Sequence, residues 1–326
     1  SPQSEIPATK SSGSGSHSKL RHRIKRANLP MLAVISCLAI ATSVSTVCGS
    51  SDKAANTSDD RLQVVTTLYP LEYFATRIGG DLVSVVNLVG AGVEAHDFEP
   101  STGDMRTMRN ADVVIYNGLG FEPWMDRAIS SLDDPEMMVV ELGPMLGMRP
   151  DAIDPHYWLD PLLAREQVQA ISDALSGAAP SLATEFRRNA DAAVTDLDAL
   201  HDEYATGLTD CRLNTFVTAH SAFGHLASRY GLDQVSVSGL SPEAEPSPSK
   251  LAELTRDIKS TGVKYVMTET ASTRGLPHAI ADEIGAEVLK LHPLESLTPD
   301  EADNGVTYLD IMAENLTALR TALECS

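Results

Sequence analysis

Four histidines of this chain stand in loops at positions where metal ligands gather in α/β proteins. His96, His220 and His292 each come shortly after a β-branched run that predicts a strand, and His156 stands in the motif Asp-Pro-His-Tyr-Trp-Leu-Asp-Pro. Ligands of open α/β sheets collect at the carboxyl ends of the strands. Neutral imidazole is a good zinc ligand, and four nitrogen or oxygen donors at ~2.0–2.1 Å complete a tetrahedron. Any one of these histidines alone is an ordinary loop residue, but their shared placement predicts that at least three face one metal-binding cleft.

The segments around these histidines have the alternating pattern of an α/β fold. Short β-branched runs alternate with amphipathic stretches both before residue 142 and after residue 213. The predicted strands are 62–67, 82–89, 112–117 and 137–141 in the first half, and 214–218, 234–237, 265–268 and 287–291 in the second. The pattern in each half therefore predicts one α/β lobe, and each lobe would contribute two of the four histidines.

A long helical stretch separates the two halves. Residues 181–208 contain no Pro, and no Gly before Gly207, which predicts a continuous helix of about 28 residues, or ~42 Å. Such a helix is much longer than the ~11–12-residue mean and could join two lobes. The predicted order is an N-terminal extension with a signal segment, a flexible tether, an N-terminal α/β lobe, a linking helix and a C-terminal α/β lobe, at residues 1–47, 48–61, 62–180, 181–208 and 209–326.

The first 48 residues have the order of an export signal: a basic stretch at 19–26, an apolar run at 31–42, then small residues up to Cys48. A permanent transmembrane helix is the alternative, but Ser and Thr dilute the apolar run and a flexible polar composition follows it. Cys48 stands where a bacterial lipoprotein carries its lipidated cysteine, and we predict that it is lipidated. Cys37 is the alternative because a smaller residue precedes it, although lipidation there would leave an apolar segment at the start of the mature chain.

The charge of the chain excludes one class of partner. The net charge is −20, and since residues 1–47 carry a net +5, the remainder carries −25. So acidic a chain would repel the phosphates of a nucleic acid instead of releasing their counterions. It would attract cations, although the general field defines no specific site.

Two cysteines remain outside the signal region, Cys211 and Cys325. An even pair in an exported protein indicates a disulfide, here one that would tie the last helix to the start of the C-terminal lobe. Two unrelated buried thiols are the alternative.

At these motifs the chain resembles the metal-binding solute-binding proteins of bacterial zinc and manganese ABC transporters. The resemblance runs from about residue 63 to residue 325, and its motifs lie at 90–100, 154–161, 218–225 and 240–247. It implies two Rossmann-like lobes joined by one long rigid helix, with the metal site in the cleft between the lobes. We expect a monomer on the extracytoplasmic face of the cell membrane, held by a lipid anchor, that delivers a divalent metal ion to an ABC permease.

By this resemblance His96, His156 and His220 are metal ligands, and a histidine at the third position is associated with zinc. Three imidazoles suit zinc, whereas manganese prefers carboxylate oxygens. The fourth ligand of the family is usually an aspartate after the last strand, and the corresponding segment here offers Glu295 or His292. Charge favours Glu295, because four neutral imidazoles would leave the ion uncompensated. The predicted cargo is Zn2+, with a manganese or iron receptor of the same fold as the alternative.

A zinc hydrolase is the alternative from another class. It would hold zinc by three histidines, with an activated water at the open position and a positioned general base. No His-Glu-x-x-His motif occurs in the sequence, and Glu94, a candidate base, has no motif around it. The sequence therefore favours capture and delivery of a metal ion without catalysis.

Overall fold

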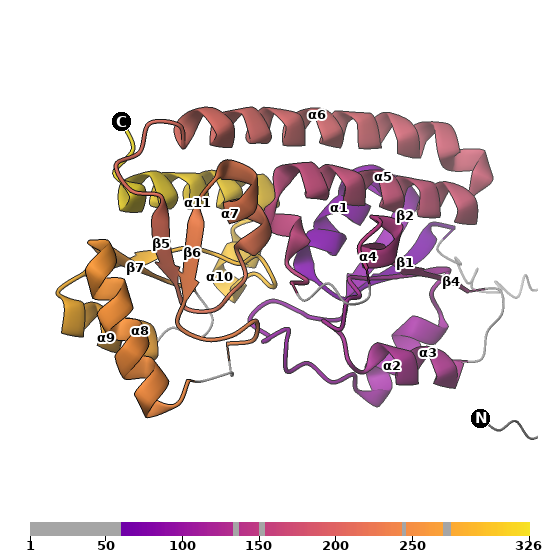
Figure 1. Cartoon of the computed structure of the whole chain (residues 1–326). Helices are drawn as coiled ribbons and strands as arrows, with labels where there is room; N and C mark the ends of the chain where they lie inside the picture. The colour runs from indigo at the N-terminus through magenta and orange to yellow at the C-terminus, as the bar shows by residue number, and fades with distance from the viewer. Residues whose placement is uncertain (1–59, 133–136, 150–153, 243–245, 270–274) are drawn as a thin grey trace, which may run out of the picture. The chain divides into compact units, whose positions relative to one another are not determined.

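The structure, a computed structural model, describes residues 60–132, 137–149, 154–242, 246–269 and 275–326 (Figure 1). By its internal contacts the chain divides into residues 1–56 and 57–326, and the description below concerns the second unit. The expected signal segment and both candidate lipidation sites, Cys48 and Cys37, lie outside the described residues. Among the described helices, none combines the length and the apolar character that a membrane crossing requires.

The first half of the described chain forms a four-stranded parallel sheet in the order β2-β1-β3-β4. Its strands are β1 (Leu62–Thr66), β2 (Val83–Asn87), β3 (Val113–Tyr116) and β4 (Met138–Glu141). All four residues of β3 are buried, as expected for a central strand of a parallel sheet that is covered on both faces. This explains why β3 is a continuous apolar run rather than an alternating one.

Helices cover both faces of this sheet. They are α1 (Tyr69–Gly79) and α5 (Pro161–Ala178) on one face, and α2 (Thr102–Arg109) and α3 (Met125–Leu132) on the other. Successive strand residues alternate between the two layers: Val113 and Ile115 pack with α1 and α5, while Val114 packs with α2 and α3. The short helix α4 (Leu142–Met145) follows β4 directly.

The second half repeats this topology. The strands of its parallel sheet, in the order β6-β5-β7-β8, are β5 (Thr215–Thr218), β6 (Asp233–Ser236), β7 (Tyr265–Thr268) and β8 (Glu287–Lys290). One face carries α7 (Gly224–Tyr230) and α11 (Tyr308–Leu323), the other α8 (Pro248–Thr261) and α9 (Leu276–Ile284), and α10 (Pro299–Asp303) precedes α11. In both sheets the strand order reverses beside the first strand, β1 or β5, and ligand sites form at such points. The fold class predicted from the sequence, two parallel-sheet α/β lobes, is confirmed.

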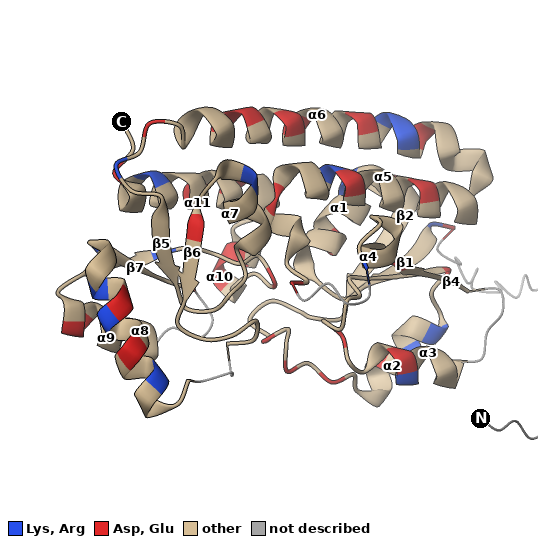
Figure 2. Ribbon diagram, viewed as in Figure 1, with Lys and Arg blue, Asp and Glu red and all other residues tan. Residues whose placement is uncertain are grey.

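The long helix α6 (Ala183–Gly207) has 25 residues. It begins two residues later than predicted because 180–182 form a 3-10 turn instead. Its buried residues recur every three or four positions, from Phe186 to Tyr204, and this apolar stripe lies against α1 and α5 of the first half and α11 of the second (Figure 1). Acidic positions recur along α6, with one basic stretch near its N-terminal end (Figure 2). The largest apolar core contains residues from both sheets, so the two halves share one core.

A disulfide joins Cys211 to Cys325, as predicted. It links the segment after α6 to the end of α11 across 114 residues of sequence.

Closing so long a loop restricts the unfolded chain, and we expect that replacing both cysteines by serine lowers the free energy of unfolding by about 2–4 kcal/mol. Urea unfolding of the double variant beside the oxidised wild type measures this difference. Coincident unfolding midpoints would contradict the expected role.

Candidate metal centre

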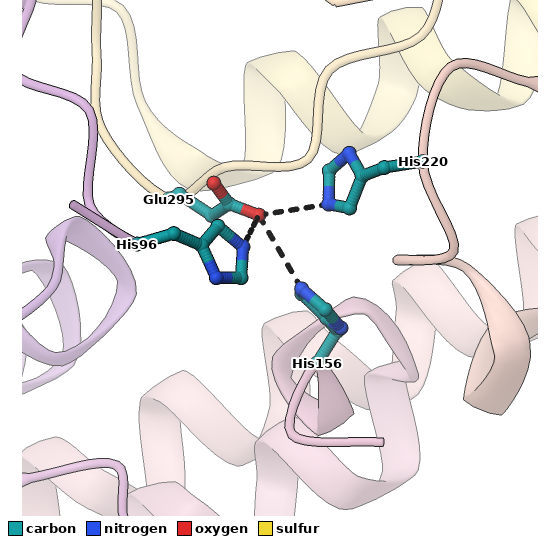
Figure 3. A group of neighbouring side chains, drawn as sticks. All are labelled: His96, His156, His220 and Glu295. Carbon is teal, nitrogen blue, oxygen red and sulfur yellow. Dashed lines mark hydrogen bonds and ion pairs between the residues drawn. The ribbon is translucent and has the colours of Figure 1, made fainter. Parts of the chain in front are cut away.

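Three imidazoles and one carboxylate converge on a single point (Figure 3). They belong to His96, His156, His220 and Glu295, and one ligand atom from each lies within 4.8 Å of every other. His156, His220 and Glu295 are buried, and the side chain of His96 is 11% exposed. Among the residues described by the structure, this is the group of His, Cys and acidic side chains that could hold a metal ion.

The three distances that involve Glu295 match the edges of a zinc tetrahedron. Oε1 of Glu295 lies 3.3 Å from Nε2 of His96, 3.4 Å from Nε2 of His156 and 3.2 Å from Nε2 of His220. Donors ~2.0–2.1 Å from a tetrahedral ion stand about 3.3 Å apart along each edge. Nε2 of His156 is buried and has no hydrogen bond of good geometry, as expected of an atom whose partner is an ion. The donor set therefore fits Zn2+ without rearrangement of these three edges.

Both sheets contribute to the group. His96 lies in the loop between β2 and α2, and His156 stands just before the 3-10 turn Tyr157–Leu159 that leads into α5. His220 comes two residues after β5, and Glu295 five residues after β8. The carboxyl ends of parallel strands thus bring together residues that are up to 199 positions apart.

Two further carboxylates orient the buried imidazoles. Nδ1 of His156 lies 2.8 Å from Oδ1 of Asp154, and Nδ1 of His220 lies 2.7 Å from Oε1 of Glu269. Such carboxylate–histidine pairs fix the ring and leave Nε2 directed at the metal. Around His96, in contrast, the described residues provide no hydrogen-bond partner for Nδ1, and its ring packs on Phe121 with centroids 4.5 Å apart.

The charges around His156 and His220 favour the protonated form of these two imidazoles when no metal is bound. Burial alone would lower the pKa of His220, but Glu269 and Glu295 raise it to about 10. Burial opposes the charge of His156 as well, and Asp154 and Glu295 raise its pKa above the ordinary value. Burial would raise the pKa of Glu295, yet the three surrounding imidazoles hold it well below its ordinary value. Glu295 is therefore ionised and ready to accept a cation.

Comparison with known proteins agrees with this geometry. The model of the ZnuA family, described as zinc-uptake complex component A, periplasmic, matches residues 64–322. The chain belongs to the ZnuA family. It is 36% identical over 280 residues to the zinc-binding lipoprotein AdcA of Streptococcus pneumoniae serotype 4, covering 81% of this chain and 56% of AdcA. It is 34% identical over 295 residues to the high-affinity zinc uptake system protein ZnuA of Bacillus subtilis, covering 85% of this chain and 92% of that protein.

A solved structure shares the fold. The crystal structure of the Zn(II)-bound ZnuA-like domain of Streptococcus pneumoniae AdcA superposes with a TM-score of 0.72 at 37% identity, covering 81% of this chain and 99% of that domain. The present chain spans 56% of the length of full AdcA. Its similarity therefore concerns the ZnuA-like part of that lipoprotein.

The structure places His292, the alternative fourth ligand, outside the group formed by the three other histidines and Glu295. Its side chain is 2% exposed, and both ring nitrogens face other partners. Nδ1 lies 2.8 Å from the backbone nitrogen of Leu294, and Nε2 lies 3.3 Å from Oε2 of Glu301. The structure therefore groups Glu295 with His96, His156 and His220, whereas His292, expected as the second histidine from the second half, has other partners.

Asp154 and Glu269 are site residues that the search for ligands in the sequence missed. Both carried a signal: Asp154 stands two residues before His156 in the same motif, and Glu269 directly follows β7, which neighbours β5 at the point where the strand order reverses. Gly224 is needed beside Asp154, because a Cβ there would come within 2.5 Å of its Oδ2. A glycine at this position lets α7 approach the carboxylate that holds His156.

We expect the variants Asp154→Asn and Glu269→Gln each to weaken zinc binding by about 10–100-fold, the usual consequence of losing the outer partner of a metal-bound histidine. Each variant keeps the size of the side chain but removes the charge that orients the imidazole. Titration of zinc against a chromophoric chelator measures the change. Asp257→Asn, an exposed aspartate of α8, is the matched control and should bind zinc as the wild type does. Wild-type affinity in both site variants would refute the role of these carboxylates.

Proposed function

We propose that this chain is the extracytoplasmic solute-binding protein of an ABC importer, and that it captures Zn2+ through His96, His156, His220 and Glu295. The observation that carries the proposal is the arrangement of three Nε2 atoms around one Glu295 oxygen at 3.2–3.4 Å, the edge length of a zinc tetrahedron. The names of the relatives AdcA and ZnuA, a zinc-binding lipoprotein and a zinc uptake protein, support the same function. The partner would be the membrane permease that accepts the ion.

The donor set favours zinc over manganese. Three imidazole nitrogens and one carboxylate oxygen suit a borderline ion in a four-coordinate site, whereas manganese prefers oxygen donors and a higher coordination number. The carboxylates of Asp154 and Glu269 lie behind two of the imidazoles and would offset the charge that Glu295 leaves uncompensated. The donor types support Zn2+ over Mn2+ as the cargo, and the two carboxylates support a divalent cation in general.

Competition between metals tests this assignment on the full chain. We expect one zinc ion per chain in a chelator titration, and no loss of zinc when manganese is added at equal concentration. If manganese displaced the zinc under these conditions, the receptor would be a manganese receptor of the same fold. If zinc bound with unchanged stoichiometry after the Glu295→Gln and His156→Ala changes, the site itself would be misassigned.

A binding role without catalysis follows from the closed coordination. Catalytic zinc sites keep one position open for water, whereas Glu295, grouped with the three imidazoles, would take the fourth position here. We infer that the zinc-loaded chain does not hydrolyse substrates. Assays with generic esters and phosphate esters, with zinc and with chelator present, should show equal background rates. A zinc-dependent rate that Glu295→Gln increases would support the hydrolase instead.

Membrane attachment through Cys48 is a separate part of the proposal, supported by the signal-like order of the residues before it. Labelling with a radioactive fatty acid in a bacterial host should mark the wild-type chain and the Cys37→Ser variant, but not Cys48→Ser. Label retained in Cys48→Ser and lost in Cys37→Ser would move the anchor to Cys37. We also propose a monomer, which size-exclusion chromatography with light scattering can test.

A further inference from the structure

The segment that carries Glu295 contains an unusual buried turn. Leu294 has φ of +64°, the left-handed region, and its side chain is completely buried. A residue with a Cβ is strained in this conformation, so surrounding contacts must hold it there. Glu295 is the next residue, and its position depends on this turn.

The imidazole of His292 holds the turn. The backbone N–H of Leu294 donates to Nδ1 of His292 at 2.8 Å. Because an amide nitrogen can only donate, Nδ1 must be the unprotonated nitrogen, and Nε2 carries the hydrogen that faces Oε2 of Glu301 at 3.3 Å. Burial also lowers the pKa of His292, which favours the same neutral ring. His292 thus acts as a hydrogen-bond acceptor inside the turn.

The surroundings keep this ring in place. The backbone N–H of His292 donates to Oδ1 of Asn315, and the backbone oxygen of His292 accepts from Nδ2 of the same asparagine, each at 2.8 Å. Glu301 accepts from the Thr298 backbone and hydroxyl at the start of α10, and it pairs with Lys290 at 2.7 Å. The imidazole therefore links the end of β8, the start of α10 and the turn at Leu294.

We propose that His292 is a positioning residue of the metal site: through the Leu294 amide it sets where the carboxylate of Glu295 stands. The inference rests on the proposed function, because it concerns the fourth ligand of that site. The turn also makes contacts with the other half of the protein, since the Tyr69 N–H donates to the backbone oxygen of Glu295 at 3.3 Å and Trp158 Nε1 to that of Pro293 at 2.8 Å. These contacts fix the backbone on both sides of Leu294, and the imidazole supplies the bond within the turn.

The role requires an acceptor, not an imidazole. An asparagine oxygen can accept a hydrogen bond from the amide two residues onward, as in an Asx turn, whereas leucine of similar size cannot. His292→Leu would leave the buried Leu294 N–H unpaired and free the turn to relax. His292→Thr and His292→Val form a second pair of equal size, in which only threonine retains an acceptor.

The experiment measures zinc affinity of the full chain by chelator competition in a double-mutant cycle with Glu295→Gln. We expect His292→Leu to weaken binding about 10–100-fold, as the loss of an outer-shell partner does, and His292→Asn to stay within about threefold of the wild type. On the Glu295→Gln background the His292→Leu change should cost no more than about twofold, because the ligand that it positions is gone. His278→Leu, at an exposed histidine of α9, is the control and should change neither value.

Two results would overturn the inference. One is equal affinity of His292→Leu and the wild type, and the other is the same fold-loss on both backgrounds, which would indicate a general structural effect. Should His292→Leu fail to fold, the Thr and Val pair decides in the same way: equal affinities would refute the role of the acceptor. If the wild type bound no zinc, or Glu295→Gln bound it unchanged, the proposed function would fail first and the inference with it.

Discussion

Replacing both His96 and His220 by alanine should abolish stoichiometric zinc binding. The change removes two of the three nitrogens and leaves Glu295 with a single imidazole partner, His156. Two remaining donors cannot complete a tetrahedral site, and the buried carboxylates of Glu295 and Glu269 lose the imidazole that they share. We expect the bound zinc to fall from one ion per chain to none after dialysis against zinc-free buffer, as measured by elemental analysis.

The control for this double variant replaces two histidines outside the group. His201, in α6, stacks on Tyr230 of α7, and His278 is exposed on α9. The variant His201→Ala with His278→Ala should retain one zinc ion per chain. Full zinc content in the His96→Ala, His220→Ala variant would remove the basis for the site as described.

Zinc affinity should fall steeply as the pH is lowered. In the metal-free protein both nitrogens of His156 and of His220 face carboxylates, and the pKa of His220 is raised to about 10 while that of His156 is raised above its ordinary value. Zinc requires an unprotonated Nε2, so binding must release these protons. Each proton released weakens binding about tenfold per pH unit, which gives a loss of up to ~10^4-fold between pH 7.5 and 5.5 for two protons.

The direction of this dependence follows from which state holds the protons. The metal-free state binds them below the raised pKa values, so affinity increases with pH and continues to increase above neutrality, toward the pKa of His220. Glu295 contributes nothing over this range, because its pKa lies well below the ordinary value and it stays ionised. Isothermal titration calorimetry in buffers of different ionisation enthalpy counts the protons released at pH 7.4.

Glu269→Gln provides a matched variant for the same measurement. It removes one of the two carboxylates that raise the pKa of His220, and it should therefore release fewer protons per zinc ion than the wild type. Zinc binding that released no protons at pH 7.4 in the wild type would contradict the proposed charge state of the site.

Much of the fold could be predicted from the sequence because its signals are local. The central strands are β-branched runs, and α2 begins and ends where its Ser101 cap and its last basic residues indicate. The amphipathic pattern of residues 121–131 predicts a helix over that range, but α3 begins only at Met125. The reason is that the buried carboxylate of Glu122 accepts hydrogen bonds from the Asn117 and Gly118 amides and from the Thr67 hydroxyl, which holds 121–124 in a turn. Contacts between residues so far apart in the sequence leave no periodic pattern of apolar residues from which they could be predicted.

The metal site, too, could be predicted only in part. Placement in the sequence singled out four histidines, the family resemblance selected His96, His156 and His220 among them, and the structure brings these three together. The choice between Glu295 and His292 could not be made by position, because both follow β8 in one short loop. The choice depends on the left-handed backbone at Leu294. With this turn, Glu295 faces the three imidazoles, whereas Nδ1 of His292 accepts the hydrogen bond from the Leu294 amide. Neither residue type nor spacing encodes that turn.

The bond between Cys211 and Cys325 also bears on how the protein must be prepared. In a reducing cytoplasm the disulfide would stay open, leaving two neighbouring thiols at the end of α11. Thiolates bind zinc and softer metals themselves. Material made there without reoxidation would therefore carry a second metal-binding pair in addition to the histidine cluster. A zinc content above one ion per chain would then report the oxidation state of the sample and not the capacity of the receptor.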